Sequence, residues 1–450
     1  MTLREHDNGR IEERLRDEKK AWDAAPLPAG LDEAVYRGLL QARRKGRLRT
    51  RRAAAAMSAA LVVVLLLGMV RVSPAFAAAV AELPGLSGLV SLVAGDSGLE
   101  GAVRNDFVQP VNVSDSHDGV MITVNGIIAD DTRLNILYTV KLPTAAKHVP
   151  FKKFDLFDAA APDKPLPVTI SFGSVPLENP TKEFQGRIDV NLGEEADMPE
   201  HVRIDMKLFG YEGLADWSIV IPVDKARFEG MKEVIPLEQA VTAEGQRMLF
   251  KQATIYPTSI AVDVEFDKAN SKRVFWLSDL VLVTDTGEEL RSQGSMNMSA
   301  DRMTLQFESS FFSKPKHLTL RGTRWMALDK SKLEMKLDLE KKEIVQAPDD
   351  KVRLVSAKKT GTGVYEITLA VKSDSSVDRY GFTIVDGPFR DAAGTVFNTG
   401  GYRTSSTEPD KDETNITFEV LLDKPYTNPL AFNIVNYPSW IEEPFEVKLK

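Results

Sequence analysis

Beyond about residue 108, hydrophobic and polar residues alternate at every second position, a pattern typical of strands that bury one face. Helical periods are nearly absent from this part of the chain. The sequence therefore predicts a mainly β body. The clearest predicted strands carry the apolar sets Val202/Ile204/Met206/Leu208, Ile260/Val262/Val264/Phe266, Leu333/Met335/Leu337/Leu339, Tyr365/Ile367/Leu369/Val371 and Ile416/Phe418/Val420/Leu422.

A weak internal repeat divides this β-rich region into three parts. Trp217, Trp325 and Trp440 each stand near the last strand of a predicted copy, and they are 108 and 115 residues apart. An immunoglobulin-like sandwich has about 100 residues, so three such units in series fit the length. We expect tandem immunoglobulin-like β-sandwich modules over residues 108–228, 229–345 and 346–450.

An uncharged run of 18 residues, Ala53–Val70, is long enough to cross a bilayer as a helix. Seven basic residues in the ten positions before it put residues 1–52 in the cytoplasm, by the positive-inside rule, and the C-terminal body outside the cell. We predict a single-pass protein of the cell membrane, with a transmembrane helix at 53–72 and juxtamembrane stalk helices at 73–107. The basic residues, which would also contact lipid headgroups, are Arg43, Arg44, Lys45, Arg47, Arg49, Arg51 and Arg52.

Two other interpretations of the apolar run compete with a permanent anchor. A buried helix of a soluble core could be equally apolar, but the basic run would have no purpose there. A cleavable signal peptide is the stronger alternative, because Ala75-Phe76-Ala77 has the small-x-small form of a cleavage site. A signal peptide usually has about 15–30 residues in total, whereas 52 residues precede this run. We therefore predict an uncleaved anchor and leave cleavage at Ala77 open.

The segment before the membrane has the pattern of two short amphipathic helices. Such a head is too small to be firmly stable alone, so its apolar faces are candidates for docking onto a partner protein. The alternative is a loosely ordered tail whose basic end rests on anionic lipid. The candidate partner-binding residues are Ile11, Leu15 and Trp22 in the first helix and Leu31, Val35, Tyr36, Leu39 and Leu40 in the second.

The composition and the motifs of the chain argue against most kinds of catalytic and metal sites. The chain has no cysteine, which excludes disulfides and thiolate sites, and its five histidines are scattered without a close pair. No phosphate-binding loop, nucleophile elbow or zinc-protease motif is present, and the acidic turns lack the ligand spacing of a calcium loop. We therefore expect no enzyme activity, no cofactor, no metal and no small-molecule substrate.

The net charge of -8 is unevenly distributed along the chain. Residues 1–52 hold 14 basic and 9 acidic residues, so the basic head precedes an acidic body. The basic run at 43–52 lacks interleaved aromatic residues and directly precedes the predicted span. We expect it to meet lipid headgroups rather than nucleic acid.

Several local motifs resemble those of a known group. These are Ser73–Ala78, Glu82-Leu83-Pro84-Gly85, and the strand pair Gly119–Ile128 with Asp130-Asp131 before Leu134–Tyr138. Over residues 30–140 the chain resembles the single-pass anti-sigma-factor-like membrane proteins of Gram-positive bacteria. Their ectodomain is a domain of unknown function (family 4179), often followed by an immunoglobulin-like module. Beyond residue 140 the similarity is one of architecture.

This resemblance implies a cytoplasmic head that sequesters an extracytoplasmic-function sigma factor of RNA polymerase, and an ectodomain that senses the state of the envelope. One departure matters, because zinc-binding anti-sigma domains use His and Cys ligands, while this head has only His6. Sigma-factor binding would then depend on the apolar helix faces. The alternative hypothesis is a membrane-anchored surface structural or binding protein, whose head serves only as an anchor.

Overall fold

The computed structural model describes Arg14 and residues 16–20, 92–147, 151–173, 179–193, 196–211, 216–374, 383–408 and 412–450. The chain divides into two units, Met1–Ala77 and Ala78–Lys450. In the first unit, the described residues are helical and exposed. The rest of the predicted head, the predicted transmembrane helix at 53–72 and the predicted stalk as far as residue 91 lie outside the described residues. No helix among the residues that the structure describes is long and apolar enough to span a membrane.

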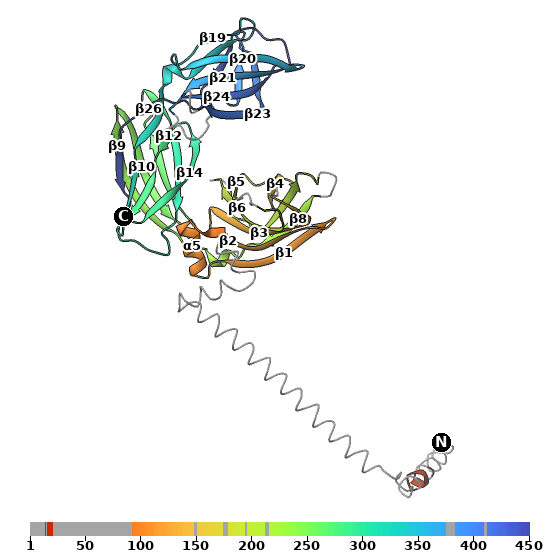
Figure 1. Ribbon diagram of the computed structural model, residues 1–450. Helices are drawn as coiled ribbons and strands as arrows, with labels where there is room; N and C mark the ends of the chain where they lie inside the picture. Colours follow the sequence, from red (N-terminus) through yellow and green to blue (C-terminus); the bar gives the residue numbers. More distant parts are fainter. Residues whose placement is uncertain are drawn as a thin grey trace, which may run out of the picture. The chain divides into compact units, whose positions relative to one another are not determined.

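The first β-module, module 1, buries one hydrophobic core between a five-stranded and a three-stranded antiparallel sheet (Figure 1). Trp217 is 1% exposed and lies in this core. The larger sheet has the order β1 (Gln109–His117), β2 (Val120–Ala129), β3 (Arg133–Ala146), β6 (Thr181–Leu192), β5 (Val168–Gly173). The smaller sheet has the order β4 (Phe151–Asp158), β7 (His201–Leu208), β8 (Trp217–Pro222), and the short helix η1 (Lys225–Arg227) follows it.

Module 2 is built in the same way around Trp325, which is fully buried. Its large sheet has the order β27 (Phe445–Lys448), β16 (Leu318–Gly322), β13 (Val281–Thr284), β14 (Glu289–Ser299), β15 (Arg302–Glu308), β11 (Ser259–Phe266), β10 (Gln246–Ile255), β9 (Glu233–Ala243). Its small sheet contains β12 (Lys272–Ser278), β17 (Arg324–Asp329) and β26 (Trp440–Ile441). The ends of the large sheet meet, because Gln239 Nε2 of β9 donates to the carbonyl of Lys448 in β27 at 2.7 Å.

Module 3 consists of one eight-stranded sheet around a hydrophobic core, to which Phe275, Met326 and Leu328 of module 2 also contribute. Met335 near one end of the sheet and Ile367 near the other end lie in the same hydrophobic cluster, so the sheet folds over on itself. The strand order is β19 (Glu343–Gln346), β18 (Glu334–Asp338), β25 (Leu430–Asn433), β22 (Pro388–Arg390), β23 (Val396–Glu408), β24 (Glu413–Leu421), β21 (Val364–Lys372), β20 (Val352–Gly361). The short helix η2 (Lys330–Lys332) leads into it.

The expected third module at 346–450 does not coincide with these sheets. β18 and β19 begin before residue 346 but pair within module 3, whereas β26 and β27 follow residue 346 in the chain and pair with module 2. Trp440 faces Met326 of β17, so it does not close a third copy of the repeat. Module 3 is therefore inserted in module 2, and the blue C-terminal strand lies beside green strands of module 2 in Figure 1.

The predicted alternation is confirmed in the strands. In β7, Val202, Ile204, Met206 and Leu208 are buried, and the residues between them are partly exposed. The apolar sets of β11 and β24 are buried in the same way. Adjacent side chains of a strand point to opposite sides, so the alternation in the sequence identifies the face of each strand that is buried in a core.

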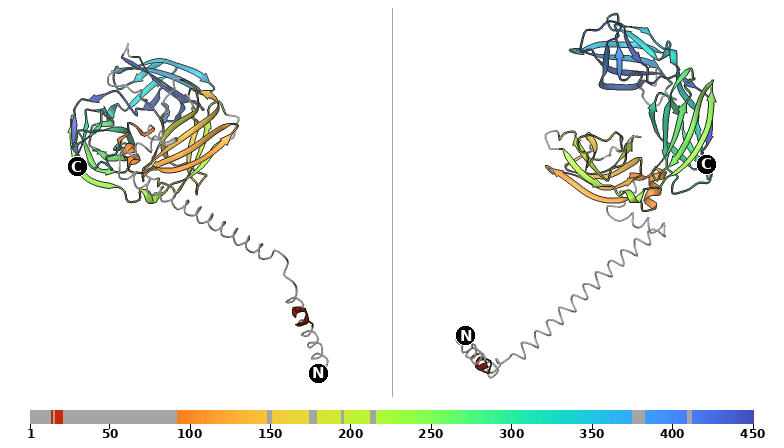
Figure 2. Two further views of the ribbon diagram at one scale, coloured as in Figure 1. Left: turned by 60° about the horizontal axis from the view of Figure 1, so that its bottom comes forward. Right: turned by 180° about the vertical axis from the view of Figure 1, so that it is seen from behind.

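The described helix nearest the predicted membrane span is α5, Ser97–Arg104. It lies within the range expected for stalk helices, but it is packed against the β-modules. Leu99 and Ala102 are fully buried in the core of module 1, and the helix also contacts β15 of module 2. Both views of Figure 2 place α5, in orange, beside these strands. The segment 92–105 therefore links the two modules at their boundary.

Candidate functional site

The sequence-predicted site residues lie outside the part of the chain that the structure describes. This holds for the partner-binding candidates Ile11, Leu15, Trp22, Leu31, Val35, Tyr36, Leu39 and Leu40 and for the basic residues 43–52. Among the described residues, no group of three or more His, Asp or Glu side chains is arranged to hold a metal ion. The polar side chains that the structure does bring together lie where α5, module 1 and module 2 meet, which we call the junction.

Asp96 is the N-cap of α5 and the first polar side chain of the junction. Its Oδ1 accepts a hydrogen bond from the Leu99 amide at 3.0 Å, which satisfies one of the free N–H groups of the first turn. Its Oδ2 accepts from Gln293 Nε2 of β14 at 2.9 Å. Since Asp96 is only 6% exposed, its charge must be matched by other groups in the junction.

Arg133, at the start of β3, supplies the matching charge. Its Nη2 lies 3.3 Å from Asp96 Oδ2 and 3.0 Å from Oδ1 of Asp189 on β6, and its Nη1 donates to the carbonyl of Thr258 at 3.0 Å. The arginine is 4% exposed. One guanidinium therefore holds together α5, two strands of module 1 and the β10–β11 turn of module 2. Removal of one partner of a buried ion pair leaves an unpaired charge in the interior, which lowers the stability of the fold strongly.

Asp130 makes a second link between the modules. Its Oδ2 accepts from the amide of Thr258 at 2.9 Å and from the Thr258 hydroxyl at 2.6 Å. Its Oδ1 accepts from the Arg133 amide at 2.9 Å and from Thr132. Both Asp130 and Thr258 are almost completely buried, so the β2–β3 turn is fixed to module 2 by charge-assisted hydrogen bonds.

Close packing completes the junction. A Cβ atom on Gly98 would lie 2.7 Å from the backbone nitrogen of Ser309 and 3.0 Å from the carbonyl of Thr258, so only glycine fits there. Phe107 packs edge-on against Phe312 of module 2, with ring centroids 5.7 Å apart. The contact between the modules therefore combines hydrogen bonds and ion pairs with the packing of apolar side chains.

Glu308 of β15 is a buried acidic group beside this contact. Its side chain is 6% exposed, and Arg291 Nε lies 3.2 Å from its Oε1. Burial raises the pKa of Glu308, as does the nearby Asp96 carboxylate, while hydrogen bonds from the Arg291 and Ser97 amides and the Arg291 charge act in the opposite direction. Arg291 also donates to the carbonyl of Gly95, which ties the chain before α5 to module 2.

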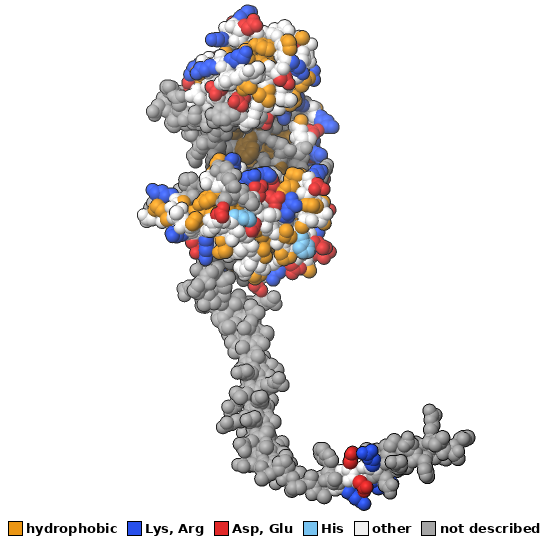
Figure 3. All heavy atoms as spheres, turned by 90° about the vertical axis from the view of Figure 1, so that its right-hand side faces the viewer, with side chains coloured by type: hydrophobic (Ala, Val, Ile, Leu, Met, Phe, Trp, Pro, Cys, Tyr) orange, Lys and Arg blue, Asp and Glu red, His pale blue; other side chains and the backbone are white. Residues whose placement is uncertain are grey.

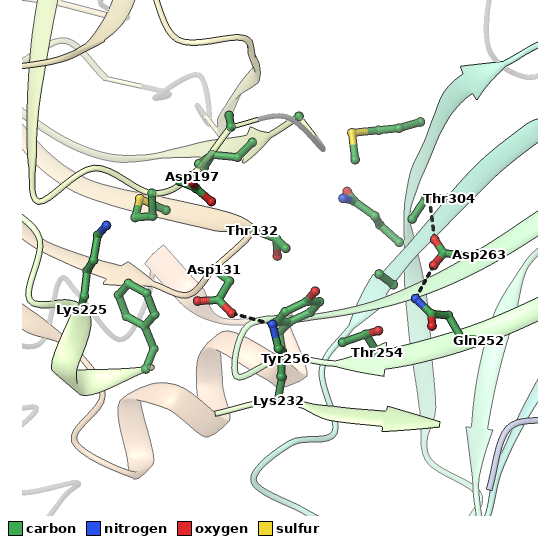
Figure 4. Close-up of a pocket in the computed structure, with 18 residues that line it drawn as sticks. Asp131, Thr132, Asp197, Lys225, Lys232, Gln252, Thr254, Tyr256, Asp263 and Thr304 are labelled. Carbon is green, nitrogen blue, oxygen red and sulfur yellow. Dashed lines mark hydrogen bonds and ion pairs between the residues drawn. The ribbon is translucent and has the colours of Figure 1, made fainter. Parts of the chain in front are cut away.

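A pocket of about 550 Å³ adjoins the junction. Figure 4 shows side chains of both modules on opposite sides of it, with Tyr256 between them. From module 1 the lining includes Asp131, Thr132, Asp197, Met198, Lys225 and Phe228; from module 2 and the segment leading into it the lining includes Lys232, Gln252, Thr254, Tyr256, Asp263, Met296, Thr304 and Gln306.

The charges in this pocket are largely compensated. Asp131 Oδ2 lies 3.4 Å from Lys232 Nζ. Asp263 accepts hydrogen bonds from Gln252 Nε2 at 2.9 Å and from Thr304 Oγ1 at 2.8 Å. Burial raises the pKa of Tyr256, with a further contribution from the carboxylates of Asp130 and Asp131, so its hydroxyl remains protonated and can donate.

Charges of both signs are mixed on the face of the molecule that Figure 3 shows. On the face shown in Figure 3, acidic, basic and hydrophobic side chains are interspersed over the described residues. A protein that binds nucleic acid presents a basic stripe or patch instead.

The junction residues were not predictable as a site from the sequence. Asp130 and Asp131 were noted only as part of a motif, and Arg133 and Thr258 look like ordinary turn residues. A usable signal was the charged pair Asp130-Asp131 placed directly before the apolar strand Leu134–Tyr138, at a point where the chain becomes fully buried.

Comparison with known families and proteins gives two family matches. Residues 47–142 match the Domain of unknown function (DUF4179), and residues 232–369 match the Family of unknown function (DUF5643). The chain thus contains the predicted domain 4179, which runs from the basic segment through α5 into β3. The second match begins just before β9 and ends in β21, so it covers most of module 2 and continues into the inserted module 3.

No curated protein matches the chain. Among solved structures, the chain is similar to a conserved domain protein from Bacillus anthracis, at 14% sequence identity and with a TM-score of 0.38. This match covers 62% of the present chain and 87% of the other chain.

Proposed function

We propose that this chain is a membrane-anchored anti-sigma-factor-like regulator. Its cytoplasmic head sequesters an extracytoplasmic-function sigma factor of RNA polymerase, and its β-rich ectodomain senses the state of the envelope. The head is residues 1–52, the transmembrane helix is residues 53–72, and the ectodomain consists of modules 1 to 3, an immunoglobulin-like series with module 3 inserted in module 2. The match to domain 4179 supports this proposal because it joins the basic segment, the apolar run and the first strands in one family domain.

The observation that carries the proposal is the position of α5. A passive anchor needs only a loose connection between membrane and ectodomain, whereas the segment 92–105 is bound by both modules. Asp96, Gly98 and Leu99 are held by Arg133, Ser309 and the core of module 1. A change in the arrangement of module 1 and module 2 would therefore alter the contacts of the segment 92–105, which follows the apolar run in the sequence.

The junction also suggests how a signal would release the sigma factor. Val93 and Leu99 are fully buried, so a protease cannot bind this part of the chain in an extended form until the junction opens. Opening would expose the juxtamembrane segment to cleavage and free the head from the membrane. A local change in packing would then be converted into a change in transcription.

In the head, the apolar stripe Leu31/Val35/Leu39 with Tyr36 and Leu40 forms the sigma-binding face. Burial of apolar area contributes roughly 25 cal/mol per Å², which is sufficient for a reversible complex. The charged side chains around the stripe set orientation and association rate.

Orientation is tested with single cysteines, because the natural chain has none. Lys268, whose side chain is 90% exposed, and the exposed Glu18 are replaced separately by cysteine. In intact cells, a membrane-impermeant maleimide should label Lys268→Cys but not Glu18→Cys, and permeabilised cells should label both. The reverse labelling pattern would overturn the proposed topology and with it the regulator.

Regulation is tested by transcription from a promoter that depends on the candidate sigma factor. Deletion of residues 1–52 should raise transcription to the level seen without the whole chain, because the head alone sequesters. If the deletion leaves transcription unchanged while removal of a separate anti-sigma protein raises it, the anchored surface binding protein becomes the better account.

A further inference from the structure

We propose that the pocket beside the junction binds a short segment of an uncharged saccharide. The saccharide is the class of ligand that the proposed ectodomain would sense. Only this role as a signal rests on the proposed function. Saccharide binding itself is a property of modules 1 and 2.

The pocket has the size and position of a ligand site. Its volume of about 550 Å³ lies within the range of roughly 300–1,000 Å³ found for small-molecule sites. One wall comes from the β2–β3 turn and the β6–β7 connection of module 1, and the other from β10, β11, β14 and β15 of module 2. Sites between two modules are common places for ligands, because both sides contribute contacts.

Its polar groups are suited to a ligand with many hydroxyl groups. Thr254 and Gln306 are 5% and 7% exposed, although both line the pocket. Each of these two side chains carries a hydrogen-bond donor and a hydrogen-bond acceptor. A ligand with several hydroxyl groups can use both kinds of group.

The charge of the lining argues against ionic ligands. The lining holds three carboxylates, Asp131, Asp197 and Asp263, and two ammonium groups, Lys225 and Lys232. Asp131 and Lys232 pair with each other, and Asp263 is occupied by two neutral donors. A phosphate or a metal ion would meet groups of both signs, whereas a neutral polar ligand would exploit donors and acceptors together.

An aromatic side chain completes the match to a sugar. Tyr256 is half-buried with a protonated hydroxyl, whereas Phe228 is 4% exposed and belongs to the core of module 1. An aromatic ring offers an apolar face to the C–H side of a pyranose, while a tyrosine hydroxyl can also hydrogen-bond. A lipid chain is a poor fit because most of the lining side chains are polar.

Ligand contacts on both walls would stabilise the closed junction. A molecule that touches Lys225 of module 1 and Gln306 of module 2 binds only when the modules are in this arrangement. Its binding energy therefore adds to that of the Arg133 and Asp130 links. Loss of the saccharide would favour opening next to α5.

Binding is measured by titration calorimetry on the full chain in micelles of a zwitterionic detergent without a sugar headgroup. The probes are chitotriose, cellotriose and maltotriose. At least one should bind, and the double variant Tyr256→Leu/Gln306→Ala should weaken that binding by about tenfold or more. The control Lys251→Ala changes a partly exposed residue of β10 that does not line the pocket, and it should leave binding unchanged.

A second measurement does not depend on the stability of that double variant. In Asp197→Cys, at the pocket, bound saccharide should slow maleimide labelling several-fold, while labelling of Lys268→Cys should stay the same. If no probe binds, if the double variant binds as well as the natural chain, or if Asp197→Cys is not protected, the saccharide proposal is wrong. Sigma-factor capture is measured separately, so saccharide binding without capture would overturn only the proposed function.

Discussion

Arg133 Nη2 lies 3.3 Å from Asp96 Oδ2, and the two side chains are 5% and 9% exposed. This buried ion pair connects β3 of module 1 with the N-cap of α5, the described helix closest to the predicted membrane span. Because the same arginine also reaches Thr258 of module 2, the pair is the point where α5, module 1 and module 2 are joined.

Arg133→Met should destabilise the junction strongly. The substitution leaves the buried carboxylate of Asp96 without its cation, whereas Asp189 keeps its ion pair with Arg187. Breaking a buried ion pair costs about 3–5 kcal/mol. Hydrogen exchange should show loss of protection at the Leu99 amide. As a control, Lys141→Met removes a pair with Glu183 in which both side chains are 52% exposed, and it should change stability by less than about 1 kcal/mol. Equal effects of the two substitutions would contradict the assigned role of Arg133.

Gly98→Ala should separate α5 from module 2. The added Cβ would lie 2.7 Å from the Ser309 nitrogen, and overpacking of this kind costs about 1–3 kcal/mol. The matched control is Gly401→Ala, where the added atom meets nothing within 4 Å. Thermal unfolding should show a lower midpoint for the first variant only. A midpoint for Gly98→Ala equal to that of the natural chain would mean that the contact is loose.

Val447→Asp should open module 2 while leaving module 3 folded. Val447 is 1% exposed in β27, and an unpaired carboxylate there is strongly unfavourable. Limited proteolysis should cut residues 233–329 and spare a fragment near 334–434. Glu446→Gln changes an exposed neighbour in the same strand and should leave the cleavage pattern unchanged. Simultaneous loss of both modules would show that module 3 does not fold independently of module 2.

The strands were predictable from the sequence because burial of one face produces alternating apolar and polar residues within each strand. Val202 to Leu208 and Ile416 to Leu422 alternate in the sequence as they do in the structure. The insertion of module 3 left no such trace. Trp440 pairs with Met326 of β17 across more than a hundred residues, and spacing alone made it look like the end of a third repeat.

The junction was hidden for a related reason. Asp130 lies in the β2–β3 turn and Arg133 at the start of β3 directly after it, where charged residues are expected to be solvated. Their burial depends on Thr258, which is distant in the sequence, so no local pattern distinguishes them. The pocket likewise requires two modules to come together before its lining residues are neighbours.

Stability near the junction should depend on pH through Glu308. Burial raises its pKa in the folded state, so the folded chain binds this proton more tightly than the unfolded chain. Its contribution to stability is therefore greatest at low pH, below the ordinary pKa of glutamate, and is lost as pH rises through the raised pKa. Glu308→Gln should reduce this dependence when thermal midpoints are compared between about pH 4 and about pH 7. A profile identical to that of the natural chain would exclude Glu308 as the source.

The head is expected to capture a sigma factor through its apolar stripe. The most direct measurement is the binding of the purified full chain to the purified candidate sigma factor, compared with the double variant Leu31→Asp/Leu39→Asp. The natural chain should form a complex and this variant should form none, because two carboxylates would be desolvated in the interface at a cost of several kcal/mol. The matched variant Asp32→Ala/Glu33→Ala should bind almost as well as the natural chain. Equal binding by the Leu31→Asp/Leu39→Asp variant, or no complex with the natural chain, would contradict the account.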